Sequence, residues 1–215
     1  MNSGLINSCR RALVLCPHTD DEFGCAGTIL RLLEAGAVVH YVALSRCEES
    51  VPTGYPINIL EIECRKCTEV LGIASDRVHI LDFKVRNFPH HRQEILEKFV
   101  SLNRQLSPDI VLMPSSFDMH QDHKTVYWEG LRAFKHCTVL GYELPQNLNS
   151  FVNSAFIALT ESQLKRKILA LSSYSSQEFR PYASQEFISA LALVRGIQAG
   201  LTYAESFELI RLIEK

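Results

Sequence analysis

The sequence predicts an α/β fold, a Rossmann-like and mostly parallel β-sheet flanked by helices on both faces. Short apolar runs rich in β-forming residues alternate with segments of helical periodicity along most of the chain. Repetition of strand, helix and strand is typical of a parallel sheet that is covered on both sides. With 215 residues, 47% of them hydrophobic, the chain suits one domain over residues 1–215.

Each element has its own signal. Residues 11–16 and 38–44 are apolar runs that predict buried strands, and residues 24–35 between them carry apolar residues at helical spacing. A helix is predicted over 59–71, where Gly72 suits the position after its end, and a short strand over 78–81. A helix over 91–106 is stopped by Pro108, and a strand follows over 110–113.

The last third of the chain has a different pattern. Short strands are predicted over residues 139–143 and 155–158, and helices over 161–172, 185–199 and 204–213. In a mostly parallel sheet, ligands bind beyond the carboxyl ends of the strands. The segments after residues 16 and 113 are therefore the first places to look for a site.

Seven scattered cysteines argue against a secreted disulfide scaffold. Cys64 and Cys67 form a lone CxxC, but Leu60, Cys64, Cys67 and Leu71 fall on one face of the predicted helix. Free cysteine packs as a small hydrophobic residue, so core packing is favoured over a redox pair or half a zinc site.

Composition excludes several functions. The formal net charge is −2, which disfavours a protein that binds nucleic acid through bulk charge. No apolar run approaches the roughly 20 residues that span a bilayer, and no secretory signal is visible. We expect a cytoplasmic protein with a small-molecule partner, no nucleic acid and no membrane; a homo-oligomer is possible.

The first polar segment follows the strand that ends at Cys16. It holds His18 and three consecutive carboxylates, Asp20, Asp21 and Glu22. Adjacent carboxylates repel one another, and a cation would remove that cost. His18 and Asp21 are spaced so that both can reach one metal ion. An acidic helix start would explain the carboxylates but not the imidazole.

The second polar segment follows the strand that ends at Met113. Asp118, His120, Asp122 and His123 lie within six residues. Both imidazoles can be ligands, or one can bind a metal while the other acts on the substrate, with Asp122 orienting an imidazole. Imidazoles plus a carboxylate, three protein ligands in all, are the set expected of a catalytic zinc with an open position. Two such segments at one sheet edge predict a metal site.

These residues carry a resemblance. Pro17-His-Thr-Asp-Asp-Glu22 and His120-Gln-Asp-His123 resemble the P-H-P-D-D-E and H-P-D-H signatures of the LmbE / PIG-L family of zinc-dependent N-deacetylases. The similarity extends to Tyr174-Ser-Ser-Gln177 and to the C-terminal end. Thr19 and Gln121 replace the signature prolines, at positions that supply no ligand in the family.

The resemblance implies a role for each of these residues. It implies His18, Asp21 and His123 as ligands of one Zn²⁺ per chain, with another divalent metal possible. Asp20 becomes the general base, and a protonated His120, tuned by Asp122, faces the substrate carbonyl. Either Asp20 or His120 can deliver a proton to the leaving amine. The expected reaction is hydrolysis of an N-acetyl group on a small amino-sugar conjugate such as an N-acetylglucosaminide.

The substrate contacts and the rival functions remain open at this level. The resemblance places Arg65 on the sugar hydroxyls, and Arg86 and Asn87, in the next connecting segment, are candidates for a polar or anionic extension. A deacylase of another N-acyl amine in specialised metabolite synthesis is the main alternative. A metal-dependent phosphoesterase is less favoured, because it needs ligands for two cations.

Overall fold

The computed structural model describes residues 4–214 and contains one mixed sheet of seven strands in the order β3-β2-β1-β4-β5-β7-β6. The first five strands in this order pair in parallel, whereas β7 runs antiparallel to both of its neighbours. The α/β fold with a mostly parallel sheet, predicted from the sequence, is confirmed.

The element bounds agree closely with the predicted ones through the parallel part of the sheet. The strands are β1 (Arg11–Cys16), β2 (Val38–Ala43), β3 (Val78–Ile80), β4 (Ile110–Pro114), β5 (Thr138–Tyr142), β6 (Ala155–Leu159) and β7 (Tyr203–Arg211). The α-helices are α1 (Leu5–Ser8), α2 (Ala26–Glu34), α3 (Ile59–Leu71), α4 (Arg92–Leu106), α5 (Gln121–Ala133), α6 (Glu161–Leu171) and α7 (Gln185–Gln198). Gly72 closes α3 with a φ of 91°, the left-handed conformation that glycine adopts without strain.

The prediction of a helix over residues 204–213 is wrong, because this segment forms strand β7. Its acidic residues look like those of an exposed helix, yet Glu205 is buried and accepts hydrogen bonds from the backbone N–H groups of Gly27 and Thr28. Pairing with β5 and β6, which lie more than 40 residues earlier in the chain, overrides the local pattern.

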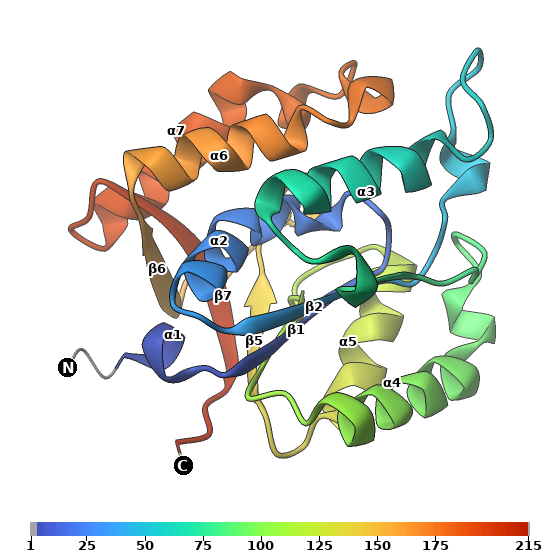
Figure 1. The fold of residues 1–215 in the computed structure, drawn as a ribbon, viewed down its shortest axis with the longest axis horizontal. Helices are drawn as coiled ribbons and strands as arrows, with labels where there is room; N and C mark the ends of the chain where they lie inside the picture. The colour runs from blue at the N-terminus through green and yellow to red at the C-terminus, as the bar shows by residue number, and fades with distance from the viewer. Residues whose placement is uncertain (1–3, 215) are drawn as a thin grey trace.

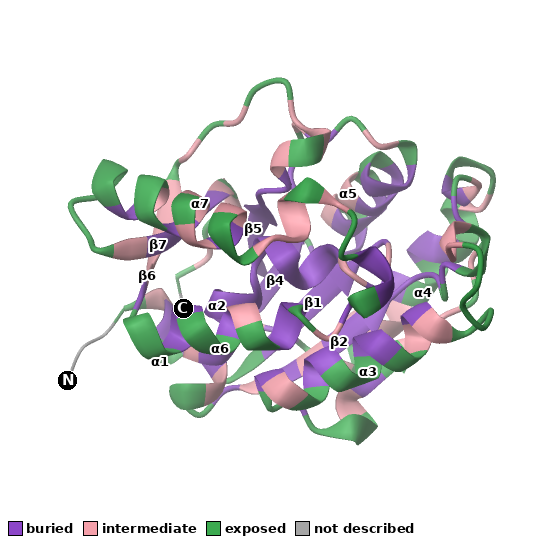
Figure 2. Cartoon of the chain, turned by 90° about the horizontal axis from the view of Figure 1, so that it is seen from above, coloured by how far each residue is buried: buried purple, intermediate pink, exposed green. Residues whose placement is uncertain are grey.

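Helices cover the sheet on both faces (Figure 1). Helices α2, α3 and α6 pack together on one face, and α4 and α5 pack together on the other. Side chains of β1 alternate between two hydrophobic clusters, with Val14 in one and Leu13 and Leu15 in the other. Because both faces of the strand are buried (Figure 2), its sequence is a continuous apolar run rather than an alternating one.

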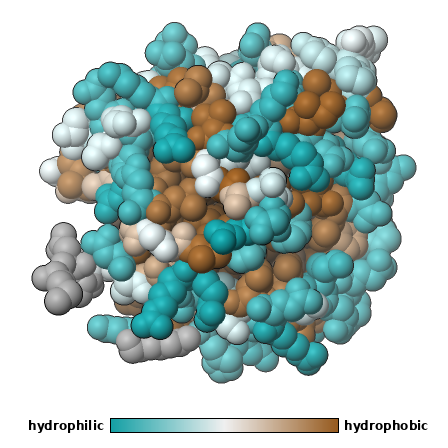
Figure 3. All heavy atoms as spheres, viewed as in Figure 1, coloured by the Kyte–Doolittle hydropathy of each residue, from teal (hydrophilic) through white to brown (hydrophobic). Residues whose placement is uncertain are grey.

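All seven cysteines are buried and none forms a disulfide within residues 4–214, and Cys64 and Cys67 belong to the hydrophobic core, as the sequence predicted. On the face shown in Figure 3, hydrophilic residues dominate the periphery and hydrophobic ones gather nearer the centre. None of the helices formed by residues 4–214 has the length and apolar character needed to cross a membrane.

Candidate metal centre and active site

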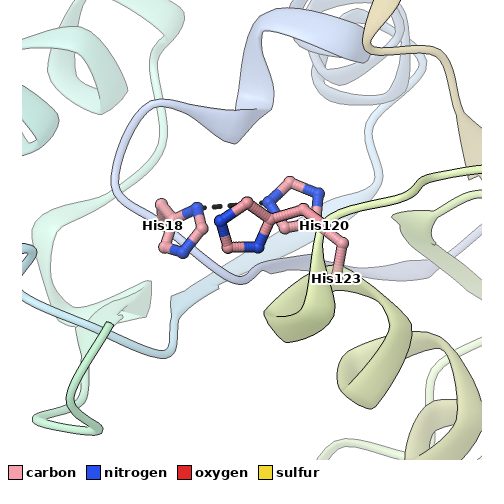
Figure 4. Close-up of side chains that lie close together, drawn as sticks. All are labelled: His18, His120 and His123. Carbon is pink, nitrogen blue, oxygen red and sulfur yellow. Dashed lines mark hydrogen bonds between the residues drawn. The ribbon is translucent and has the colours of Figure 1, made fainter. Parts of the chain in front are cut away.

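The two polar segments meet because their strands are neighbours. β1 and β4 pair in parallel, with Val14 opposite Leu112, so the chain leaves both strands at the same edge of the sheet. His18 lies in the loop after β1, whereas His120 and His123 lie at the start of α5, which follows β4. In Figure 4 the three imidazoles point toward one another from these two loops, about a hundred residues apart in sequence.

Three side-chain atoms form a compact triangle. His18 Nδ1 lies 3.1 Å from His123 Nε2, and Asp21 Oδ2 lies 3.4 Å from the first nitrogen and 3.3 Å from the second. Ligands of a tetrahedral zinc at about 2.0–2.2 Å from the metal lie about 3.3–3.6 Å from one another. The triangle therefore has the dimensions of one face of a tetrahedral site.

A second grouping includes His120. Ring nitrogens of His18, His120 and His123 all lie within 4.8 Å of one another, so three imidazoles can also hold a metal ion. His120 has less freedom than the other two, because it is the N-cap residue of α5 and its Nδ1 accepts a hydrogen bond from the backbone N–H of Asp122. Only its Nε2 remains available to a metal or a substrate.

Two buried carboxylates orient the imidazoles from behind. Asp118 Oδ2 lies 2.8 Å from His123 Nδ1, and Asp118 Oδ1 accepts the backbone N–H of His120. Asp122 Oδ2 lies 3.1 Å from His18 Nε2. Such contacts fix the tautomer of a metal-binding imidazole and leave its other nitrogen as a ligand. The sequence expected Asp122 to act on His120, but its carboxylate reaches His18 instead. No role was predicted for Asp118.

Burial shifts several pKa values in this cluster. Burial raises the pKa of Asp21 well above its ordinary range, with His18 acting in the opposite direction. A bound cation would remove this cost. Burial opposes ionisation of Asp122 too, but hydrogen bonds from His18 and from the backbone N–H of Arg86 lower its pKa. These carboxylates suit a site that holds positive charge.

The surroundings of His120 favour its neutral imidazole form. Burial, and then the charges of His123 and His18, lower its pKa to about 4. The backbone N–H of Asp122 can only donate, so Nδ1 of His120 is unprotonated and the ring hydrogen is on Nε2. The expectation of a protonated His120 therefore does not fit the structure, because the helix start needs this ring as an acceptor.

The two remaining acids of the first segment have different surroundings. Asp20 is half-buried, lines the cavity described below, and its carboxylate makes no hydrogen bond with any residue in the range 4–214. Glu22 is fully buried and is held by the hydroxyls of Tyr41 and Tyr174 at 2.8 and 2.6 Å. Burial raises the pKa of Glu22 to about 7. Asp20 thus has access to a ligand, and Glu22 belongs to the core beneath the loop.

The metal-side residues open into a cavity of about 370 Å³. Besides Arg86, its walls come from segments to which the sequence assigned no function, and their polar side chains belong to Ser50, Gln146, Asn147, Gln177, Arg180 and Tyr182. Burial and then the charge of Asp20 raise the pKa of Tyr182 to about 12. The Tyr174-Ser-Ser-Gln177 stretch was the one sequence signal near this wall.

The three predicted substrate-binding residues divide between the cavity and the surface. Arg86 lines the cavity. Asn87 is its half-buried neighbour and donates from Nδ2 to the carbonyl of Val85, but does not line the cavity. Arg65 lies outside the cavity on an exposed side of α3, where it pairs with Glu61 at 3.0 Å. The expected Arg65 contact with substrate is not supported, because a partner one helical turn away holds the guanidinium.

Solved structures share the fold at low sequence identity. The N,N'-diacetylchitobiose deacetylase from Pyrococcus horikoshii aligns with a TM-score of 0.78 and 19% identity over 94% of this chain and 84% of its own. The zinc-inhibited form of teicoplanin deacetylase Orf2 aligns with a TM-score of 0.73 and 15% identity over 95% and 100%. GalB, the 4-carboxy-2-hydroxymuconate hydratase from Pseudomonas putida KT2440, aligns with a TM-score of 0.76 and 21% identity over 96% and 99%.

Sequence comparison assigns the family. No curated protein is similar enough to the chain to count as a match. The family described as PIG-L, GlcNAc-PI de-N-acetylase, matches residues 13–134, a range that contains both polar segments and more than half of the chain. The protein therefore belongs to the PIG-L family of hydrolytic de-N-acetylases.

Proposed function

We propose that the protein hydrolyses the N-acetyl amide of a small amino-sugar conjugate, using one zinc ion held by His18, Asp21 and His123. The observation that carries this proposal is the triangle of ligand atoms with sides of 3.1, 3.3 and 3.4 Å at the floor of a polar cavity. Family membership supports the reaction class, and deacetylases among the structures of similar fold are consistent with it.

The fit favours Asp21 over His120 as the third ligand. Asp21 Oδ2 lies within 3.4 Å of both other ligand atoms, and Asp21 is held in place by the backbone N–H of His18 at 2.7 Å. His120 keeps its Nε2–H for another partner. A zinc ion bound by two imidazoles and a carboxylate would keep one coordination position open. It would polarise an acyl oxygen and lower the pKa of a bound water to about 7.

Asp20 is the proposed general base. It is adjacent to Asp21 in the chain and lines the cavity, and its carboxylate makes no hydrogen bond with the described residues. A carboxylate in this position accepts the proton of the attacking water as the new C–O bond forms. The same proton then passes to the amine nitrogen when the C–N bond breaks. The surroundings of His120 lower its pKa and favour the neutral imidazole, which is a weaker acid than a protonated Asp20 for that second transfer.

His120 is the proposed oxyanion donor. Its Nδ1 is bound to the start of α5, which directs the Nε2–H away from the helix. A fixed donor that meets the developing negative charge of the acyl oxygen contributes about 3–4 kcal/mol to the transition state. This role needs a neutral imidazole, so it differs from the protonated one expected from the sequence.

The reaction test is a panel of substrates with separate readouts. Zinc-loaded protein, with one metal per chain measured beforehand, is incubated with N-acetylglucosaminides, N-acetyl amino acids and phosphate esters. We expect primary amine and acetate in equal amounts from the sugars. Phosphate without amine would refute the reaction class, and amine only from amino acids would refute the sugar. The likeness to a hydratase calls for one more arm, a hydroxymuconate-type dienoate, which we expect to remain unchanged.

A further inference from the structure

Two arginines of the cavity lack an acidic partner. Arg86 and Arg180 both line the cavity, and neither guanidinium pairs with a carboxylate anywhere in residues 4–214. Arg180 is half-buried, whereas Arg86 is exposed. Elsewhere, Glu129 binds both Arg92 and Arg132, and Glu143 binds Arg195. An unpaired guanidinium at a cavity wall is available to an anionic group of a ligand.

The position of Arg180 is set by a chain of hydrogen bonds. Glu63, 1% exposed, accepts bonds from the hydroxyl of Ser175 and from the backbone and hydroxyl of Ser176. The side-chain amide of Gln177 donates to the Ser176 hydroxyl, and its oxygen accepts from Arg180 Nε at 2.6 Å. This series of hydrogen bonds occupies Nε, and the terminal nitrogens, which lie beside Tyr182, are the donors that can meet an oxyanion.

Aromatic rings and the backbone restrict the two arginines further. The Arg180 guanidinium carbon lies 5.3 Å from the ring of Phe179 and 5.7 Å from that of Tyr182. Arg86 has a φ of 68°, a costly conformation for a residue with a side chain. Its backbone N–H donates to Asp122 at 2.6 Å, and its carbonyl accepts from Gln121 at 3.1 Å. Both arginines therefore line the cavity without forming an ion pair with a carboxylate of residues 4–214.

We infer that Arg180 and Arg86 form an anion subsite, so that the preferred substrate is an N-acetylated amino sugar bearing a phosphate or carboxylate group away from its acetamide. This inference rests on the proposed function and narrows its substrate class. The acetamide lies at the end of the cavity that holds His18, Asp21 and His123, and the anionic group lies at the arginine wall. The subsite acts in binding and takes no part in bond cleavage.

The kinetic test compares matched substrates on zinc-loaded protein. Methyl N-acetylglucosaminide is neutral, N-acetylglucosamine 1-phosphate and 6-phosphate carry a phosphate, and N-acetylmuramic acid carries a carboxylate. We expect kcat/KM to be about 10- to 100-fold higher for at least one anionic substrate, mainly through KM, which is the range of one charge-assisted pair. The phosphate and carboxylate arms identify the anion. Equal kcat/KM for all four would overturn the inference.

Matched variants connect the preference to the two arginines. Arg180→Gln and Arg86→Gln are each expected to lower the anion preference, the ratio of kcat/KM for the anionic substrate to that for the neutral one, at least about tenfold, with zinc content unchanged. Arg104→Gln is the control, because Arg104 is exposed on α4, outside the cavity. A preference that survives both cavity variants would mean that the anion binds the metal, and the subsite would be wrong.

Binding separates this inference from the proposed reaction. Calorimetry with glucosamine 6-phosphate, glucosamine 1-phosphate, muramic acid and methyl glucosaminide needs no turnover. Tighter binding of an anionic amino sugar that Arg180→Gln abolishes would support the subsite even if no amine were released from any N-acetyl substrate. Hydrolysis of the neutral sugar with no difference in binding would support the reaction and refute the subsite.

Discussion

Replacing Asp118 with asparagine is expected to weaken zinc binding, because Asp118 controls the tautomer of His123. Asp118 Oδ1 accepts the backbone N–H of His120 at 2.9 Å, and Oδ2 lies 2.8 Å from His123 Nδ1. In the variant the amide oxygen takes the place of Oδ1, since only an oxygen can accept that N–H. The amide NH₂ then faces His123 Nδ1 and requires an unprotonated nitrogen there.

This change of tautomer affects Nε2 of His123, the proposed zinc-binding atom. A neutral His123 with an unprotonated Nδ1 carries its hydrogen on Nε2, the nitrogen that lies 3.1 Å from His18 Nδ1 and 3.3 Å from Asp21 Oδ2. Restoring the ligand tautomer costs free energy at each binding event. Loss of such an orienting partner typically lowers metal affinity 10- to 100-fold, or about 1.4–2.8 kcal/mol.

The assay is competition for zinc between the protein and a chromophoric chelator at constant pH. Asp82→Asn is the matched control, because Asp82 is an exposed aspartate that makes no hydrogen bond within the described residues. Circular dichroism of both variants verifies the fold. A zinc affinity for Asp118→Asn within twofold of the parent protein would refute this reasoning, as would an equal loss in the control.

Three further predictions test the base, a buried acid and a tight turn. Asp20→Asn should keep its zinc and lose about 10²- to 10⁴-fold in kcat, whereas His123→Ala should lose its zinc and, as a consequence, its activity. Metal analysis and kinetics of both variants distinguish the two; loss of zinc from Asp20→Asn with zinc retained by His123→Ala would mean that the two roles are exchanged. Glu22 has its pKa raised from 4.5 to about 7, so its stabilising contribution is full below pH 4.5 and is lost as pH rises toward 7. The unfolding free energy of the parent minus that of Glu22→Gln should fall by up to roughly 3 kcal/mol over that window, and a flat difference would contradict it. Gly196→Ala should lower the unfolding free energy by about 1–3 kcal/mol in urea titration, because the new Cβ would lie 2.5 Å from the carbonyl oxygen of Thr202; an unchanged midpoint would show that the turn relaxes.

The strands up to β5 and most of the helices between them could be predicted from the sequence because their signals are local, whereas helix α5 was not predicted. Continuous apolar runs mark strands buried on both faces, and Gly72 and Pro108 mark helix ends where their backbone restrictions allow little else. Strand β7 was not predicted because the strands that pair with it are distant in the sequence. In addition, an acidic residue such as Glu205 is typical of an exposed helix, whereas this one is buried.

The site divides in the same way. The residue pattern placed both polar segments at the carboxyl edge of the sheet, and the family resemblance implied His18, Asp21 and His123 among them. That β1 and β4 are neighbours, so that the two segments meet, was decided by the tertiary structure. Which carboxylate orients which imidazole depended on side-chain directions across that edge, so only the tertiary structure paired Asp118 with His123.

The wall of the cavity that contains Arg180 could not be predicted from local sequence patterns. Arg180 arrives there from a turn held by the buried carboxylate of Glu63, which lies more than a hundred residues earlier on α3. Residue type and spacing indicate the local secondary structure of a segment and which of its faces is buried. The meeting of segments distant in sequence is decided by packing, in which each contact depends on all the others.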